Sequence, residues 1–158
     1  MRRLVVIAVM LGMACLATPV SAADTGVSLS IDRVSYVNKT FVDVELSVSC
    51  QGPRPSVNRH VEFDGPMIYV DIIQSAGSRL AAGGAWVWFD GATLCDGSVH
   101  SLTASVMVDP YTRSFKPGRA MVAAGIDAGY YWWNEKTGRD GYVDQWTEIP
   151  WAPVRIQR

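Results

Sequence analysis

Residues 42–50 alternate strictly between apolar and polar side chains, and this pattern constrains the fold more than any other feature of the 158-residue chain. Val42, Val44, Leu46 and Val48 share one face of an extended segment, while the intervening positions are aspartate, glutamate and serine. Because successive side chains of a strand point to opposite faces, the pattern predicts a strand with one buried face. Cys50 is in phase with the apolar positions, so its sulfur is expected to point into the core.

Short segments of similar character recur along the rest of the chain, separated by turn residues. They are residues 27–31, 60–63, 67–73, 85–89, 101–108, 119–126, 130–133 and 142–146. Residues 75–84 are small and glycine-rich, and Asp90-Gly91 predicts a tight hairpin turn. Nowhere do apolar residues recur at helical spacing over three turns.

These segments predict an all-β fold, an antiparallel β-sandwich of immunoglobulin-like architecture. The likeness is one of architecture only, because the antibody-type signature is missing. Trp86 and Trp88 precede the second cysteine, and Thr93 stands two residues before Cys95. No repeat or linker interrupts the chain, so residues 23–158 are expected to form a single β-sandwich domain.

The N-terminal segment has the three parts of an export signal. Arg2 and Arg3 precede an uncharged apolar run over residues 4–17, and small residues follow at 21–23. The run is shorter than the roughly 20 residues that span a bilayer, which favours a cleaved signal over a membrane anchor. Residues 1–22 are therefore predicted to be a signal peptide. The mature protein is expected to be secreted from a bacterial cell, with no stable membrane span.

Two cysteines, Cys50 and Cys95, follow the signal segment. An even number of cysteines in an exported chain predicts one disulfide, with two free buried thiols as the alternative. A zinc site lacks ligands, because His60 and His100 are the only histidines and have no metal-ligand spacing.

The charge balance and the motifs argue against several classes of function. The 14 Lys and Arg against 15 Asp and Glu give a formal net charge of −1, which excludes the basic balance of a nucleic-acid binder. Neither histidine has a recognisable catalytic partner in the sequence, and no Gly-x-Ser-x-Gly motif is present. Residues 134–141 miss the EF-hand spacing and favour a plain hairpin loop. The chain is predicted not to be an enzyme, with no catalytic, cofactor-binding or metal-binding residues.

Aromatic residues gather near the C-terminus, where four of the 6 Trp lie. If residues 130–133 are a strand, Tyr131 and Trp133 share one face while Tyr130 and Trp132 share the other. Both faces enter one core only if the strand is central, so some of these rings are expected to be exposed. Planar rings on a protein surface stack on sugars or form protein interfaces; the alternative is that they complete the core. The candidate binding surface consists of Tyr131, Trp132, Trp133, Tyr142 and Trp146.

Three short motifs resemble a family of small exported proteins of Streptomyces and related actinobacteria, a domain of unknown function. They are the strand ending in cysteine at residues 44–50, Cys-Asp-Gly and the strand after it at 95–100, and Pro-Gly-Arg-Ala at 117–120. The resemblance covers about residues 28–126. The chain departs from the family at Leu102, where a Trp is common in the family. The resemblance does not extend to the tail from Tyr130 onward. The family resemblance implies an exported β-sandwich with one disulfide, and no activity.

Together these observations favour a non-catalytic secreted binding module whose aromatic region contacts a ligand, a cell-envelope glycan or an extracellular protein. Two alternatives remain open. One is a small secreted hydrolase that uses carboxylates, and the other is a secreted inhibitor or effector that binds through the proline-containing loop at residues 51–58.

Overall fold

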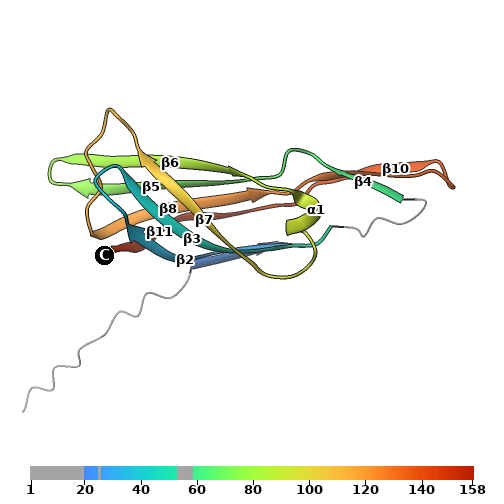
Figure 1. Ribbon diagram of the computed structural model, residues 1–158, viewed down its shortest axis with the longest axis horizontal. Coiled ribbons are helices and arrows are strands. Elements are labelled where there is room, and N and C mark those ends of the chain that lie inside the picture. Colours follow the sequence, from blue (N-terminus) through green and yellow to red (C-terminus); the bar gives the residue numbers. More distant parts are fainter. Residues whose placement is uncertain (1–19, 25, 53–58) are drawn as a thin grey trace, which may run out of the picture.

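The computed structural model describes residues 20–24, 26–52 and 59–158, which form strands and one short helix (Figure 1). The elements are β1 (Val20–Asp24), β2 (Val27–Tyr36), β3 (Phe41–Cys50), β4 (Arg59–Phe63), β5 (Met67–Ala76), β6 (Arg79–Trp88), α1 (Gly91–Leu94), β7 (His100–Val108), β8 (Gly118–Asp127), β9 (Tyr130–Asn134), β10 (Arg139–Val143) and β11 (Trp146–Gln157). The predicted all-β class is confirmed. The predicted signal segment 1–22 lies outside the described residues, except for its last three, which belong to β1. No helix in the described ranges has the length and apolar character that crossing a membrane requires.

The main sheet closes on itself into a mixed barrel of 7 strands. Their order around the barrel is β2, β11, β8, β5, β6, β7 and β3, and the pairing of β3 with β2 completes the circle. All neighbouring pairs are antiparallel except β2 and β11. The predicted antiparallel, immunoglobulin-like β-sandwich is therefore wrong.

The closed barrel differs from the predicted sandwich at two narrow seams, where its two groups of strands pair with each other. β6 meets β7 only at Gly83–Val108 and Gly84–Met107, and β11 meets β2 only at Ile156–Val34 and Gln157–Ser35. Elsewhere the barrel consists of two broad groups of strands, as in a sandwich. Alternation of side chains tells which face of a strand is buried but not which edges pair, so it cannot distinguish a sandwich from a flattened barrel.

Glycine permits the first seam. A Cβ added at Gly83 would lie 2.2 Å from the carbonyl oxygen of Met107, so a larger residue would force β6 away from β7. The glycine-rich segment at residues 75–84 contains the first half of β6. The turn itself is shorter and includes Gly77, which has a positive φ of 73°.

The core contains the inward-facing side chains of the barrel strands. In β3 the burial pattern alternates without interruption, and the predicted face of this strand is confirmed. The largest buried side chains come from several strands and from one loop; they include Leu29, Leu46, Ile68, Ile72, Phe115, Ile126, Ile149 and Ile156.

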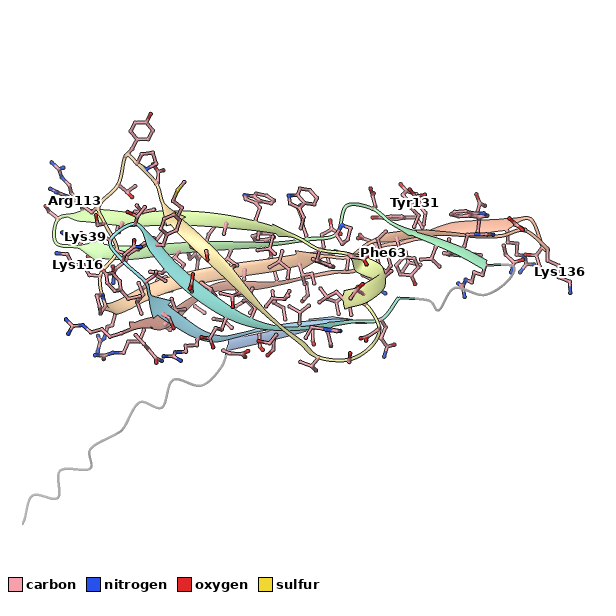
Figure 2. All side chains as sticks on the ribbon, in the orientation of Figure 1. Lys39, Phe63, Arg113, Lys116, Tyr131 and Lys136 are labelled. Atoms are coloured by element: carbon pink, nitrogen blue, oxygen red, sulfur yellow. A yellow bond between two sulfur atoms is a disulfide. The ribbon has the colours of Figure 1, made fainter. Side chains whose placement is uncertain are left out.

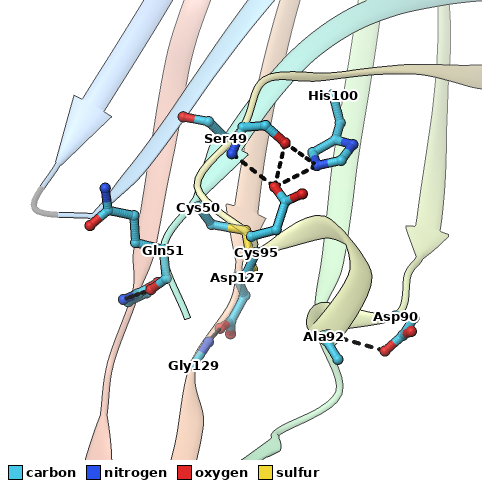
Figure 3. Close-up of a disulfide and its surroundings, with 12 residues drawn as sticks. Ser49, Cys50, Gln51, Asp90, Ala92, Cys95, His100, Asp127 and Gly129 are labelled. Atoms are coloured by element: carbon cyan, nitrogen blue, oxygen red, sulfur yellow. Dashed lines mark hydrogen bonds and ion pairs between the residues drawn. A yellow bond between two sulfur atoms is a disulfide. The ribbon is translucent and has the colours of Figure 1, made fainter. Parts of the chain in front are cut away.

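A disulfide joins Cys50, at the end of β3, to Cys95, directly after α1, as predicted (Figure 3). Both cysteines are buried. Asp90 does not form the predicted hairpin turn. Its carboxylate instead caps α1 by accepting a hydrogen bond from the backbone N–H of Ala92 at 3.1 Å.

A second, three-stranded sheet of β10, β9 and β4 extends beyond one end of the barrel (Figure 1). β9 follows β8 and β10 precedes β11, so the two sheets share a long bent hairpin. At the bend, the backbone N–H of Ala128 donates to the carbonyl oxygen of Gln145 at 2.7 Å. The predicted aromatic hairpin is confirmed for β9 and β10, but Trp146 belongs to β11 of the barrel.

Candidate functional site: an exposed aromatic strip

Two tryptophans stand on the outer surface of the barrel at β6. Trp86 and Trp88 are separated by one residue, so they share a face, and their side chains are 64% and 67% exposed. Trp86 pairs across the sheet with Tyr69 of β5, with ring centroids 6.0 Å apart. Tyr69 in turn lies over Gly125 of β8, where an added Cβ would come within 2.3 Å of the phenol ring. Glycine at this position lets the tyrosine lie flat on the sheet.

Two more tryptophans stand on the same outer face at β11. Trp146 of β11 is the cross-strand partner of Asp127 of β8. The row continues through Met67 of β5 to Trp88 of β6. Trp88 and Trp146 therefore lie in one row across four strands. Trp151 sits where the register between β11 and β8 shifts, and about half of its side chain is exposed. Such an irregularity redirects side chains locally.

The aromatic face continues onto the three-stranded sheet. Tyr131 and Tyr142 are cross-strand partners with ring centroids 4.7 Å apart, and both are about half exposed. Trp133 stacks on His60 of β4 at 4.9 Å with an interplanar angle of 13°. Tyr131 and Trp133 follow Asp127 of β8 by an even number of positions, so their side chains point to the same face as that of Asp127. This is also the face of Trp146, the cross-strand partner of Asp127. Figure 2 labels Tyr131 on the part of the molecule that extends beyond the barrel.

We call this set of exposed rings on one outer face the aromatic strip. It consists of Trp86, Trp88, Tyr131, Trp133, Tyr142, Trp146 and Trp151.

The strip contains four of the five residues of the predicted candidate surface. Trp132 is the exception, because it lies on the opposite face of β9, against Gly141 and beneath the guanidinium of Arg59 at 4.9 Å. Sequence reasoning missed Trp86 and Trp88, although their spacing of two residues within a predicted strand was the signal that places them on one face. It also left Trp151 out of the surface.

The cross-strand rows that make up the strip are acidic. They include Glu62, Asp71, Asp127, Asp140 and Glu148, and no lysine or arginine belongs to these rows. The hydroxyl of Tyr69 donates a hydrogen bond to Glu148 at 3.3 Å. Partial burial, followed by the charge of Glu148, raises the pKa of Tyr69 above its ordinary value, so the phenol keeps its proton and remains a donor.

An open groove of about 380 Å³ adjoins the strip at Trp151. Its other walls include Asp71 and Gly84 of the barrel surface, and Asp109 and Pro110 of the connection after β7. Most of the residues that line the groove are apolar, and its two acidic residues are Asp71 and Asp109.

Away from the strip, Asp96, Ser98 and His100 form a cluster beside the disulfide (Figure 3). Sequence reasoning assigned His100 no partner, but its Nε2 lies 2.9 Å from Asp96 Oδ1 and 3.1 Å from Ser98 Oγ. In a catalytic triad the acid and the serine contact different ring nitrogens of the histidine. Here both contacts use Nε2, so the cluster lacks the geometry of a proton relay and instead closes the turn at Gly97.

This cluster predicts a pH-dependent contribution to stability. Hydrogen bonds from Ser98 and then His100 hold the pKa of Asp96 well below its ordinary value. A lowered folded-state pKa stabilises the fold above the unfolded pKa near 4, and the contribution is lost as the pH falls toward the folded value. We expect Asp96→Asn to unfold at lower urea concentration than the wild type at pH 7, and the difference to shrink below about pH 4. A difference that is unchanged at pH 2 would contradict this assignment.

Comparisons with protein families, with curated proteins and with solved structures found no match to the chain. The resemblance to the exported actinobacterial family therefore stays a prediction. Within the described ranges, no three His, Cys, Asp or Glu side chains gather in an arrangement that suits a metal ion.

Proposed function

We propose that the protein is a non-catalytic binding module and that the aromatic strip binds an extended cell-envelope polysaccharide with an uncharged sugar backbone. The observation that carries the proposal is the alignment of exposed tryptophan and tyrosine rings along one face of two sheets. Scattered exposed apolar residues are ordinary, whereas many large rings gathered on one face mark a contact surface.

The chemistry of the strip suits a sugar chain. The C–H face of a pyranose ring stacks on a flat aromatic ring, and each large ring offers about 150–250 Å² of surface to cover. The carboxylates between the rings accept hydrogen bonds from sugar hydroxyls, and charge-assisted bonds of this kind are the stronger ones. Because these rows lack lysine and arginine, a polyanionic chain would meet like charge.

The length of the strip favours a polymer over a single sugar. Asp140, the cross-strand partner of Trp133, precedes Trp151 by 11 positions along β10 and β11, and this segment is at most about 36 Å long at roughly 3.3 Å per residue. A monosaccharide covers only one or two of the rings, so affinity is expected to rise with chain length.

The predicted export signal places such a module outside the cell, where envelope glycans are accessible. The buried Cys50–Cys95 disulfide is consistent with an oxidising compartment.

Removal of two strip rings is expected to abolish retention on the polysaccharide. We expect Trp86→Ala/Trp88→Ala to be retained at least tenfold less than the wild type on whichever of peptidoglycan, chitin or cellulose binds the protein. The two side chains are more than 60% exposed, so the double variant is expected to remain folded. Sedimentation with each insoluble polysaccharide measures the bound fraction.

Val99→Ala serves as the matched control, because Val99 is 72% exposed and lies between α1 and β7, outside the strip. If the wild type is retained on none of the three polysaccharides, the glycan proposal is wrong. Equal losses for the double variant and for Val99→Ala would also contradict it.

The strip supports a protein partner less well, because a row of acidic side chains between the rings would need a complementary basic surface. The hydrolase and inhibitor hypotheses stay predictions. Most of the loop proposed for the inhibitor, residues 53–58, lies outside the described residues.

A further inference from the structure

The end of the barrel opposite the three-stranded sheet carries a basic pocket. Lys39, Arg79, Arg113 and Lys116 line an opening of about 360 Å³, together with the hydroxyls of Ser78 and Ser114. Figure 2 shows Lys39, Arg113 and Lys116 at this end of the molecule and Lys136 at the other.

Three connections that are distant in sequence bring the cations together. Lys39 belongs to the turn between β2 and β3, Arg79 begins β6, and Arg113 and Lys116 lie between β7 and β8. Charge clusters in sequence do not reveal this pocket, because no two of these segments are adjacent in the chain.

The backbone beneath the cations is fixed by hydrogen bonds. The N–H of Arg113 donates to the carbonyl oxygen of Leu80 at 2.9 Å, which ties this connection to β6. The buried side chain of Gln74 accepts from the N–H of Lys116 at 2.9 Å and donates to the carbonyl oxygen of Lys116 at 2.8 Å. Phe115, between the two cations, is fully buried in the core. The positive charges therefore stand on a rigid support.

Among the described residues, no acidic side chain balances the pocket. No aspartate or glutamate lines it, and none of its four cations takes part in an ion pair within the described ranges. The whole chain has a formal net charge of −1, so an excess of basic residues does not explain the cluster. Like charges held together on a fixed frame repel one another, and an anion relieves this repulsion.

We infer that this pocket binds a phosphoryl group, either as free phosphate or as the phosphodiester of a larger ligand. The planar guanidinium groups of Arg79 and Arg113 can each form paired hydrogen bonds with phosphate oxygens. Lys39 and Lys116 add charge, and the two serine hydroxyls add donors. The site is independent of the aromatic strip, which is acidic.

Isothermal titration of the purified protein with inorganic phosphate and, separately, with dimethyl phosphate at constant ionic strength tests the inference. We expect saturable binding at one site, at least tenfold weaker in Arg79→Gln/Arg113→Gln. The control Lys136→Gln/Arg139→Gln removes the same charge at the other end of the molecule and is expected to bind as the wild type does. Circular dichroism establishes that both variants are folded.

The two anions distinguish the source of the phosphoryl group. Binding of inorganic phosphate alone indicates a free phosphate site, and binding of both anions indicates that a diester fits; either supports the inference. The inference would be overturned if neither anion showed saturable binding. It would also be overturned if Arg79→Gln/Arg113→Gln and the control Lys136→Gln/Arg139→Gln weakened the binding equally.

Discussion

Replacing Cys50 and Cys95 together with serine is expected to lower the free energy of unfolding by about 4 kcal/mol. The two residues are 45 positions apart in sequence, and cross-linking them restricts the unfolded chain. The bond also holds the end of β3 against α1, whose Gly91 packs against the ring of Phe63. Loss of the bond therefore loosens the point where the barrel meets the three-stranded sheet.

Urea unfolding measures this effect, with the oxidised wild type, the double serine variant and the wild type in dithiothreitol compared at one pH. The reduced wild type is expected to unfold close to the double variant. A loss below about 1 kcal/mol would show that the bond contributes little, contrary to the chain-entropy expectation.

Phe115→Ala is expected to destabilise the protein by about 3–5 kcal/mol. Phe115 lies in the connection between β7 and β8, yet its side chain is completely buried, and it fills the end of the barrel beneath the basic pocket. An added Cβ at Gly83 would lie 3.1 Å from its ring, so the phenylalanine also packs against the narrow seam between β6 and β7. Alanine would leave a cavity that the hydrogen-bonded connection cannot easily close.

Tyr111→Ala is the matched control for this change. Tyr111 belongs to the same connection but is 96% exposed, so its truncation is expected to change the free energy of unfolding by less than about 0.5 kcal/mol. If the two variants unfold at the same urea concentration, the ring of Phe115 does not close the barrel as described.

Local patterns predicted the parts of the fold that depend on one strand at a time. The alternation in residues 42–50 identified β3 and its buried face, and the phase of Cys50 was consistent with the buried disulfide. Which edges pair depends on contacts between distant strands. The seams at Gly83 and at Ile156 are only two residue pairs long, so no pattern within either strand reveals that the barrel closes.

The difference between patterns within one strand and pairing between distant strands also explains which parts of the sites could be predicted. The hairpin of residues 130–143 was recognisable from its aromatic residues, and the alternation separated Tyr131 and Trp133 from Trp132. The connection of these rings to Trp86 and Trp88 depends on the pairing of β5 with both β6 and β8, which sequence reasoning did not supply. The basic pocket likewise exists only because three turns meet at one end of the barrel.

The six tryptophan indole N–H signals in a ¹⁵N-correlation spectrum test most directly whether the aromatic strip is a binding surface. Titration with a soluble oligosaccharide of the polysaccharide that retains the protein is expected to shift the signals of the five strip tryptophans: Trp86, Trp88, Trp133, Trp146 and Trp151. The signal of Trp132, which lies on the opposite face beneath Arg59, is expected to stay in place. Shifts at Trp132 with none at Trp86 and Trp88, or no shifts at all, would contradict the account.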